Sequence, residues 1–410
     1  MAGRGLRRAL LEASPLMSLP LIALFIAAFA FGTTEFVIAG ILPEVADGLG
    51  TSIPTAGILI SGYAIGIAVG GPLLTVLTGR VSRKSLLIGL AVAFCAGQVA
   101  CALAPDFASM LLVRVAVAMA HGTFFGVAMV VAVGLVREEQ RGMAVAFVLA
   151  GLTVSNVVGV PAGTAIGNLF GWRATFWTMF WLGIAATIAM IALVPRTGAA
   201  ASPPGLMREI RVFGRQQVWT SLILMMMLMI GQFVPFTYIA PMLREETRLS
   251  AELVPLALLL NGAGATAGVF VGGRLAGRKP MPAMISLMAL QSAVLAIFHA
   301  VIPYALPVMA VIAVWGCINF AIGTLIQTRI LVWSADAPNL ASSMIPAGFN
   351  IGIALAAFVG GVLLSAGFGY RSLPVLGVFA MALATGIAAL SAASERRSGA
   401  RPPLGATADP

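Results

Sequence analysis

The sequence predicts an all-α polytopic membrane protein with twelve transmembrane helices in two pseudo-symmetric six-helix bundles. Three observations support this prediction. Of the 410 residues, 60% are hydrophobic and only 9% are charged, which is typical of membrane proteins and not of soluble ones. At about 20 apolar residues a crossing, the chain has room for about a dozen spans. A short motif recurs 198 residues apart and relates the second half of the chain to the first.

Twelve apolar runs follow one another along the chain, mostly with short connections. We expect helices over residues 17–42, 53–77, 85–104, 108–135, 143–169, 173–194, 219–243, 252–276, 281–302, 305–331, 341–366 and 372–392. Met1–Arg8 is basic and precedes an apolar run, as in a signal peptide, but no cleavage site follows a short apolar region and more spans come after. Residues 1–16 therefore precede the first span. We interpret them as a cytoplasmic N-terminal segment before an uncleaved first helix.

The longest connection, residues 195–218, divides the chain into bundles over residues 17–194 and 219–392. It contains Ser202-Pro-Pro-Gly205 and four arginines, and we expect it to be a cytoplasmic loop. Residues 393–410 carry three arginines and a pair of prolines. We expect them to form a disordered cytoplasmic tail.

The two halves resemble each other after their second helices. The motif is Thr75-Val-Leu-Thr-Gly79-Arg80 in the first half and Gly273-Arg-Leu-Ala-Gly277-Arg278 in the second, at equivalent points. Duplicated halves around a midplane site are typical of transporters. The repeat therefore favours a transporter.

Basic residues are unevenly distributed between the two sides of the predicted membrane. With a cytoplasmic N-terminus, 19 of the 24 lysines and arginines lie on the inner side, four lie on the outer side, and Arg114 lies within helix 4. This asymmetry predicts that both termini are cytoplasmic. We expect the membrane to be a bacterial cytoplasmic membrane. The net charge of +10 then reflects topology, so we expect a lipid bilayer and no nucleic acid as partner. We expect the chain to act as a monomer.

Glu35 is the one acidic residue deep in a predicted span. A charged group there costs on the order of 2.5–3.5 kcal/mol or more, so its presence needs a reason. Ala28, Gly32, Glu35 and Ala39 share one helix face, whose small residues allow a neighbouring helix to approach closely. Glu35 should therefore point into the bundle. We interpret it as a proton-coupling carboxylate, and a structural carboxylate is the alternative.

Helix 4 places Arg114, Ala118, His121 and Phe125 on one face. Because helix 1 runs outward and helix 4 inward, Arg114 and Glu35 both fall in the outer half of the membrane. A nearby positive charge lowers the proton affinity of a carboxylate, whereas desolvation raises it, and transport can switch between these influences. His121 is nearer the midplane and is a candidate proton relay, with a packing histidine as the alternative.

Helix 5 carries small residues at four-residue spacing: Gly151, Ser155, Gly159, Gly163 and Gly167. Such a stripe allows contact between helix backbones, and Pro161 within it can kink the helix.

The candidate residues for a substrate cavity are polar and aromatic side chains at membrane depth. We expect the substrate cavity to be lined by Phe31, Thr34, Phe125, Asn156, Gln232, Tyr238, Asn261 and Asn350.

These motifs resemble those of the major facilitator superfamily, specifically its twelve-helix drug/proton antiporter branch. Gly32-Thr-Thr-Glu35-Phe-Val-Ile-Ala-Gly40-Ile-Leu-Pro43 is similar to the first-helix signature of arabinose-efflux-like and nucleoside-efflux-like bacterial exporters. Arg114 with His121-Gly-Thr-Phe-Phe125 resembles their helix 4, and Gly159-Val-Pro161-Ala-Gly163 resembles the antiporter motif of helix 5. The similarity covers residues 17–392.

The loop between helices 2 and 3 departs from the superfamily pattern Gly-x-x-x-Asp-Arg-x-Gly-Arg-Arg/Lys. The basic residues remain as Arg80, Arg83 and Lys84. The acid is replaced by Gly79, and the two glycines by Thr75 and Ser82. The usual Asp–Arg conformational latch therefore lacks its acid.

The sequence favours a proton-driven exporter of small amphipathic, drug-like molecules that works by alternating access. Efflux of sugars or nucleosides is the alternative, and a passive channel is a remote one. A membrane-embedded enzyme is disfavoured because the spans contain no paired acids, metal-ligand cluster or activated nucleophile. Cys95, Cys101 and Cys317 lack metal-ligand spacing, and His121 and His299 lie far apart, so we expect neither a metal nor a cofactor.

Overall fold

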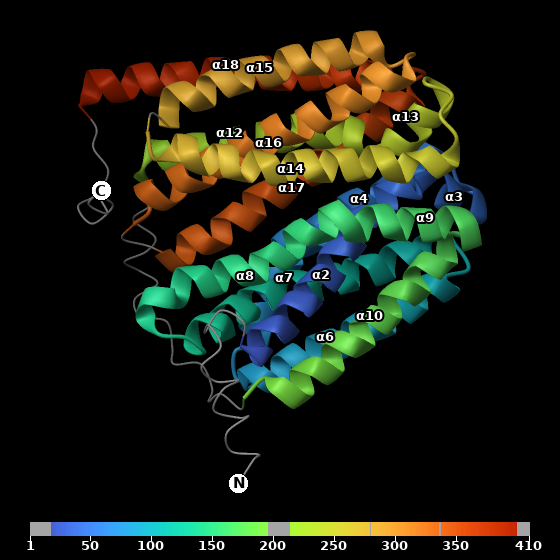
Figure 1. Cartoon of the computed structure of the whole chain (residues 1–410), viewed down its shortest axis with the longest axis vertical. Helices are drawn as coiled ribbons and strands as arrows, with labels where there is room; N and C mark the ends of the chain where they lie inside the picture. The colour runs from blue at the N-terminus through green and yellow to red at the C-terminus, as the bar shows by residue number, and fades with distance from the viewer. Residues whose placement is uncertain (1–17, 196–213, 279, 336–337, 400–410) are drawn as a thin grey trace, which may run out of the picture.

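Long helices run side by side through the computed structural model, which describes residues 18–195, 214–278, 280–335 and 338–399. Within these residues, twelve helical segments are long and apolar enough to cross a membrane, which confirms the predicted all-helical fold. Figure 1 shows the helices of the first half of the chain packed as one group and those of the second half as another. We call these groups the first and the second bundle.

The first bundle has six spans. Its elements are α2 (Leu19–Gly40), the short α3 (Leu42–Gly48), α4 (Ile53–Ile65), η2 (Gly66–Gly70), α5 (Gly71–Leu77), α6 (Arg83–Leu103), α7 (Phe107–Gly134), η3 (Glu138–Gln140), α8 (Arg141–Val154), η4 (Ser155–Gly159), α9 (Val160–Phe170) and α10 (Trp172–Leu193).

The second bundle repeats this plan. Its elements are α12 (Gln216–Thr237), the short α13 (Ile239–Glu245), η6 (Ala251–Leu253), α14 (Val254–Ala276), α15 (Pro280–Val301), α16 (Ala305–Trp333), α17 (Pro338–Ser365) and α18 (Ser372–Ser398). The central residues of the predicted 195–218 connection lie outside the described residues.

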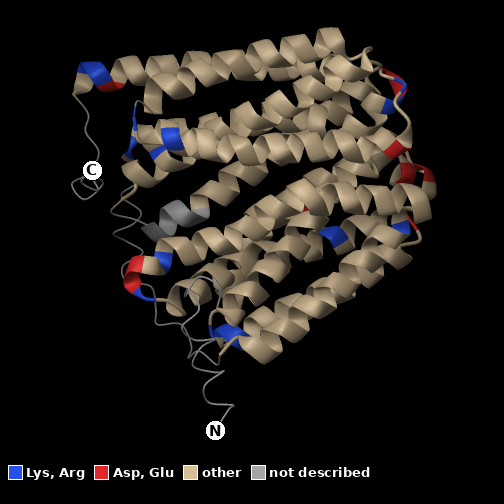
Figure 2. Cartoon of the chain, viewed as in Figure 1, with Lys and Arg blue, Asp and Glu red and all other residues tan. Residues whose placement is uncertain are grey.

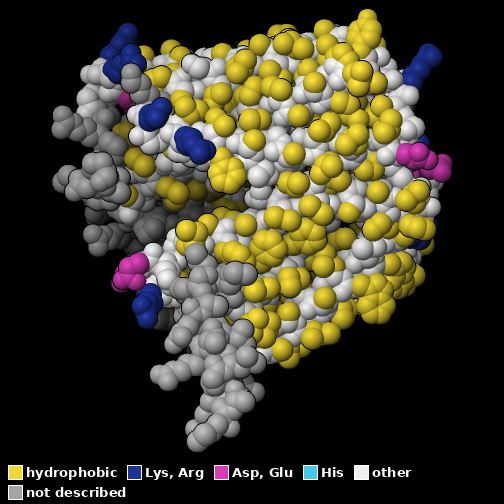
Figure 3. All heavy atoms as spheres, viewed as in Figure 1, with side chains coloured by type: hydrophobic (Ala, Val, Ile, Leu, Met, Phe, Trp, Pro, Cys, Tyr) yellow, Lys and Arg dark blue, Asp and Glu magenta, His cyan; other side chains and the backbone are white. Residues whose placement is uncertain are grey.

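Charged residues concentrate at the two ends of the helices, as Figure 2 shows. The face seen in Figure 3 is apolar over the helix middles and carries charged side chains at its edges.

Polar residues also cap the first turns of individual helices. Asp106 caps α7 by accepting a hydrogen bond from the Ser109 backbone N–H at 2.8 Å, and this bond lowers the pKa of Asp106 below its usual value.

The first and seventh spans are each broken near one end. The sequence predicts single helices there, whereas α2 ends at Gly40 and α12 ends at Thr237, and each is followed by a short helix. Pro43 and Pro241 lie just after the two breaks. Proline lacks a backbone N–H and clashes with the carbonyl four residues earlier, which interrupts a continuous helix. The breaks define one end of the molecule, which we call the α3/α13 end.

Two spans of the first bundle contain a π turn. The turn η2 lies between α4 and α5, and η4 lies between α8 and α9. Each π turn ends two residues before a proline, Pro72 or Pro161, so the wider turn accommodates the missing N–H donor. Both turns lie against the second bundle, η2 beside α17 and η4 beside α14.

The bundles are joined near the α3/α13 end. Arg244 of α13 donates a hydrogen bond to Glu44 of α3 at 2.5 Å, and Asn168 of α9 donates to the Ala251 carbonyl at 2.7 Å. The core of the second bundle continues without a break into α3 and the neighbouring parts of α2 and α4. A separate apolar core fills the rest of the first bundle.

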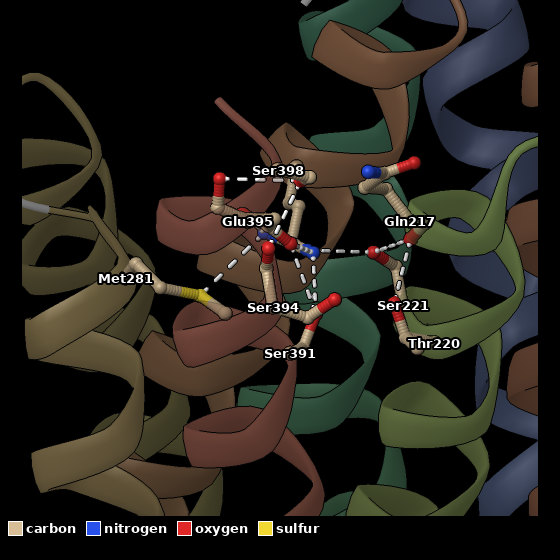
Figure 4. A network of polar contacts seen from close by, with 9 residues as sticks. Gln217, Thr220, Ser221, Met281, Ser391, Ser394, Glu395 and Ser398 are labelled. Atoms are coloured by element: carbon tan, nitrogen blue, oxygen red, sulfur yellow. Dashed lines mark hydrogen bonds and ion pairs between the residues drawn. The ribbon is translucent and has the colours of Figure 1, made fainter. Parts of the chain in front are cut away.

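At the opposite end, the second bundle contains a buried charged network, shown in Figure 4. The Arg329 guanidinium of α16 pairs with the Glu395 carboxylate of α18. It also donates to Ser221 of α12 at 2.9 Å, to Ser391 at 3.1 Å, and toward the sulfur of Met281 in α15 at 3.5 Å. One guanidinium thus connects four helices.

This network explains a difference from the sequence prediction. The sequence predicts that the last helix ends at residue 392 and that a disordered tail follows. In the structure α18 continues to Ser398, because Glu395 is held by Arg329 and Ser391. Residues 400–410 of the predicted tail lie outside the described residues.

Candidate functional site

Glu35 is buried among helices of the first bundle, beside the boundary with the second, and its helical pattern predicts this burial. Its helix α2 is the most buried span, with 78% of its apolar window buried against 33% for α10 and for α15. Glu35 itself is only 8% exposed. Gly32, one turn earlier, meets Ser155 and Leu152 of the fifth span, so small residues do bring a neighbouring helix close.

The ionisable group nearest to Glu35 comes from α7. The Nε2 atom of His121 lies 3.8 Å from Oε2 of Glu35, the distance of an ion pair when the ring is protonated. The other ring nitrogen, Nδ1, lies 3.0 Å from the Tyr63 hydroxyl of α4. Phe31 and Phe125 pack against the imidazole with ring centroids 5.3 and 5.0 Å away. Three helices therefore contribute to one chain of polar groups: Tyr63, His121 and Glu35.

Arg114 is the buried cation of the site and is 1% exposed. Its guanidinium lies over the Tyr63 ring, 4.6 Å from the centroid, in the geometry of a cation–π contact. It donates long hydrogen bonds to the carbonyls of Thr34 (3.5 Å) and Leu59 (3.4 Å), and its Nη2 has no hydrogen-bond partner among the described residues. Arg114 is close enough to interact electrostatically with Glu35, but the ion-pair contact of Glu35 is with His121.

A small cavity touches Glu35 at the boundary between the two bundles. Its lining residues are Glu35, Phe36, Ala39 and Ile60 of the first bundle and Phe233 and Phe236 of α12. The cavity has room for about one water molecule. A drug-sized molecule can therefore occupy this position only after the bundles move apart.

None of the residues expected to line the substrate cavity is among those that line the small cavity at Glu35. Phe31 and Thr34 are buried inside the first bundle. Asn261 donates to the Ile312 carbonyl at 3.1 Å and so joins α14 to α16, and Tyr238 donates to the Ala357 carbonyl at 2.8 Å and so joins α12 to α17. In both hydrogen bonds the side chain donates to a backbone carbonyl of a neighbouring helix, so these two groups link helices.

Two of the three remaining amides have a buried oxygen that lacks a hydrogen-bond partner among the described residues. Asn156 and Asn350 each donate to the carbonyl four residues earlier in their own helix. Gln232 and Asn350 are buried, and the Oε1 of Gln232 and the Oδ1 of Asn350 have no hydrogen-bond partner among the described residues. Both lie on helices of the second bundle.

The loop after the second span is built from local contacts. Thr75 donates to the Gly71 carbonyl in its own helix, and Ser82 caps α6. Lys84 reaches the carbonyl of Ile191 at the end of α10, at 2.7 Å. Arg80 is exposed and forms no ion pair with a described residue, as the replacement of the usual acid by Gly79 predicts. Arg83 opens α6.

The glycines of the fifth span are in contact with α2. A Cβ atom on Gly163 would lie 2.7 Å from Val37, and one on Gly159 would meet Thr33 and Phe29. Pro161 is in the first turn of α9, where its missing N–H is tolerated. The predicted close contact of helix backbones is present.

Comparison with known proteins identifies the family. The family model of the Major Facilitator Superfamily matches residues 24–332. The chain belongs to this superfamily. It is therefore a multi-pass membrane transporter of the secondary type and not an enzyme.

Relatives within the superfamily match most of the chain. The inner membrane transport protein YdhP of Escherichia coli O157:H7 is 37% identical over 373 residues, 91% of this chain and 96% of the relative. A chloramphenicol resistance protein of Streptomyces lividans is 34% identical over 352 residues, 82% of this chain and 87% of the relative. The crystal structure of a bacterial homologue of the human lysosomal transporter Spinster, inward-facing and occupied, has a TM-score of 0.74 at 17% identity. It covers 92% of this chain and 97% of its own, and it shows the superfamily fold.

Sequence reasoning selected Glu35, Arg114 and His121 but missed Tyr63 and the phenylalanines beside Glu35. The sequence shows no acid near His121, because Glu35 comes from another helix. Tyr63 lies in an apolar stretch of α4 with nothing to mark it. A buried hydroxyl within a span is the one available signal, since such a group needs a hydrogen-bond partner.

Proposed function

We propose that this superfamily member is a proton-coupled antiporter that exports small amphipathic, drug-like molecules across a bacterial cytoplasmic membrane. One observation carries the proposal. The Glu35 carboxylate is buried at the boundary between the bundles, beside residues of both. An ionisable group buried inside a membrane protein is a functional candidate by default. The motif resemblance to the drug/proton antiporter branch supports the proposal.

The position of Glu35 suits alternating access. In this mechanism the bundles move relative to each other around a fixed midplane site. Because Phe233 and Phe236 of α12 cover Glu35, such a movement exposes the carboxylate to one side of the membrane or the other. Protonation removes the charge, which weakens the attraction to Arg114 and lowers the cost of burial. Glu35 then favours the covered state only when it carries a proton.

The proposed cargo follows from the lining. Phenylalanines and aliphatic side chains surround the carboxylate, which suits an apolar molecule with a polar group. The unpaired amide oxygens of Gln232 and Asn350 are candidate hydrogen-bond partners for that group. The relative from Streptomyces lividans, a chloramphenicol resistance protein, supports a drug-like cargo. Export of sugars or nucleosides is the alternative and would call for more stacking aromatics around the site.

The proposed orientation places the α3/α13 end on the outer side and both termini in the cytoplasm. In this orientation the hydrogen bonds between the bundles at the α3/α13 end hold the outer side together, as an inward-facing state requires. We test the orientation with single cysteines at the exposed positions Glu139 and Glu252, in a variant without the three native cysteines. Glu252→Cys should react with an impermeant maleimide added outside, and Glu139→Cys only after permeabilisation. The reverse pattern overturns the orientation.

The coupling role is tested with Glu35→Gln, which resembles the protonated carboxyl permanently. Everted vesicles should lose concentrative efflux of a drug, and substrate-induced proton release from purified protein should disappear. Exchange of labelled for unlabelled drug should survive. Glu138→Gln, which changes an exposed carboxylate, is the matched control and should behave as the unmodified protein. Uphill pumping by Glu35→Gln at the normal rate would place the coupling site elsewhere.

A further inference from the structure

We propose that Tyr63 is a positioning residue for proton coupling, because its hydroxyl sets which nitrogen of His121 presents a proton to Glu35. The proposal rests on the coupling function proposed above. It concerns a residue that the sequence motifs do not mark, on a helix that contributes no other ionisable side chain to the site.

The geometry fixes both rings. Tyr63 is 1% exposed and His121 is 3% exposed. The Tyr63 hydroxyl and His121 Nδ1 are 3.0 Å apart, and Nε2 on the other side of the imidazole faces Glu35 at 3.8 Å. The Arg114 guanidinium covers the Tyr63 ring, and Phe31 and Phe125 hold the imidazole. The imidazole therefore presents one nitrogen to each neighbour.

The hydrogen-bonding capacity of each group leads to a single arrangement for the charged carboxylate. A neutral imidazole has one N–H donor and one acceptor nitrogen, and the tautomer is set by the partner of either nitrogen. A charged carboxylate carries no proton to donate, so with its oxygen 3.8 Å from Nε2 it electrostatically favours the tautomer with the proton on Nε2. Nδ1 must then accept, and the Tyr63 hydroxyl is the donor within reach. When Glu35 is protonated, the hydroxyl can rotate and accept instead, so both tautomers keep their partners.

Other ionisable groups near this chain are few. Arg114 of α7 lies against Tyr63, and Cys101 of α6 is close enough to interact electrostatically with both. The elements η2 and α5, which also pack on α7, carry none. On α8 the charged residue is Arg141, in the first turn. The tautomer of His121 is thus governed by Tyr63 on one side and Glu35 on the other.

The test uses Tyr63→Phe, which keeps the ring under Arg114 and removes only the hydroxyl. Nδ1 then loses its donor, and the proton distributes over both nitrogens. The Nε2–H that faces the Glu35 carboxylate is then present only part of the time and stabilises its negative charge less, so the pH of half-maximal substrate-induced proton release should move upward by about 0.5–1 pH unit. A purely structural role would lower the rate equally at every pH. Tyr304→Phe is the control, because that tyrosine is exposed and lies just before α16 in the second bundle.

A second measurement reads the tautomer directly. The chain has two histidines, so ¹⁵N-histidine labelling gives two sets of ring signals, and His299→Gln assigns them. At a pH where Glu35 is charged, we expect His121 protonated at Nε2 in the unmodified protein and at both nitrogens in Tyr63→Phe. If that variant fails to accumulate, 3-fluorotyrosine at position 63, a stronger donor, should move the proton-release midpoint downward.

The outcomes separate the two proposals. An unmodified protein with His121 protonated at Nδ1, or a Tyr63→Phe variant with unchanged tautomer and midpoint, overturns the role of Tyr63 while Glu35→Gln still abolishes coupling. Normal proton release from Glu35→Gln overturns the coupling function. The ¹⁵N spectra of Tyr63→Phe then still decide the hydrogen bond itself.

Discussion

The pair of Arg329 and Glu395 gives the sharpest stability prediction. Their side chains are 9% and 19% exposed, and among the described residues Glu395 provides the one carboxylate that contacts Arg329. Glu395→Ala leaves the guanidinium buried with only neutral partners. Removing one member of a buried pair costs about 3–5 kcal/mol, because the remaining charge is uncompensated. The free energy of unfolding, measured by SDS titration in mixed micelles, should fall by that amount.

An exposed pair on the same protein is the matched control. Arg141 and Glu138 are 51% and 80% exposed, and such pairs contribute about 0–1 kcal/mol. Glu138→Ala should therefore change the unfolding free energy little. The double variant Arg329→Met with Glu395→Leu removes both charges and should recover most of the loss. Equal effects of Glu395→Ala and Glu138→Ala would refute the reasoning.

Three further predictions concern transport. Gly163→Leu should abolish efflux while protein remains in the membrane, because the leucine side chain would separate the fifth span from α2. Transport into vesicles measures the efflux, and an immunoblot of the membranes measures the amount of protein. Gly79→Asp should be tolerated in the same assay, since a Cβ there meets only ordinary contacts, whereas Arg80→Ala should slow cycling more than it weakens drug binding. Arg244→Ala removes the contact with Glu44 and should increase labelling of cavity cysteines from the α3/α13 end, with unchanged labelling as the contrary result.

The spans were predictable because each is a long apolar run, and a run of that length has few alternatives in a membrane. The residues at which the helices end were harder to predict. The sequence predicts that α18 stops at residue 392, since the following serines, glutamate and arginines are polar. Their helical structure depends on Arg329, which lies in another span and cannot be recognised as a partner from local sequence. The breaks after Gly40 and Thr237 follow from prolines already visible in the sequence.

In the site, too, features within one helix could be predicted and contacts between helices could not. An isolated acid in an apolar run identifies Glu35 without any structure, and helical spacing places Arg114 and His121 on one face. Which of the two contacts Glu35 depends on how α2 and α7 cross, and periodicity within one helix carries no information on that. Tyr63 and Phe233 were missed for this reason: their importance comes from neighbours on other helices.

The π turn in the fifth span changes how its glycine stripe is to be understood. Positions four residues apart advance by about 40° on a regular α-helix, so a stripe of five would wind well off one face. Yet the five stripe positions all contact the first span or Ile41, the residue just after it: Gly151, Ser155, Gly159, Gly163 and Gly167. The wide turn η4 lies mid-stripe and takes up part of that rotation. The four-residue spacing therefore keeps the stripe on one face because the π turn contains one residue more than an α-helical turn. Deleting one residue of η4 would rotate Gly163 and Gly167 by about 100° around the helix axis, away from α2.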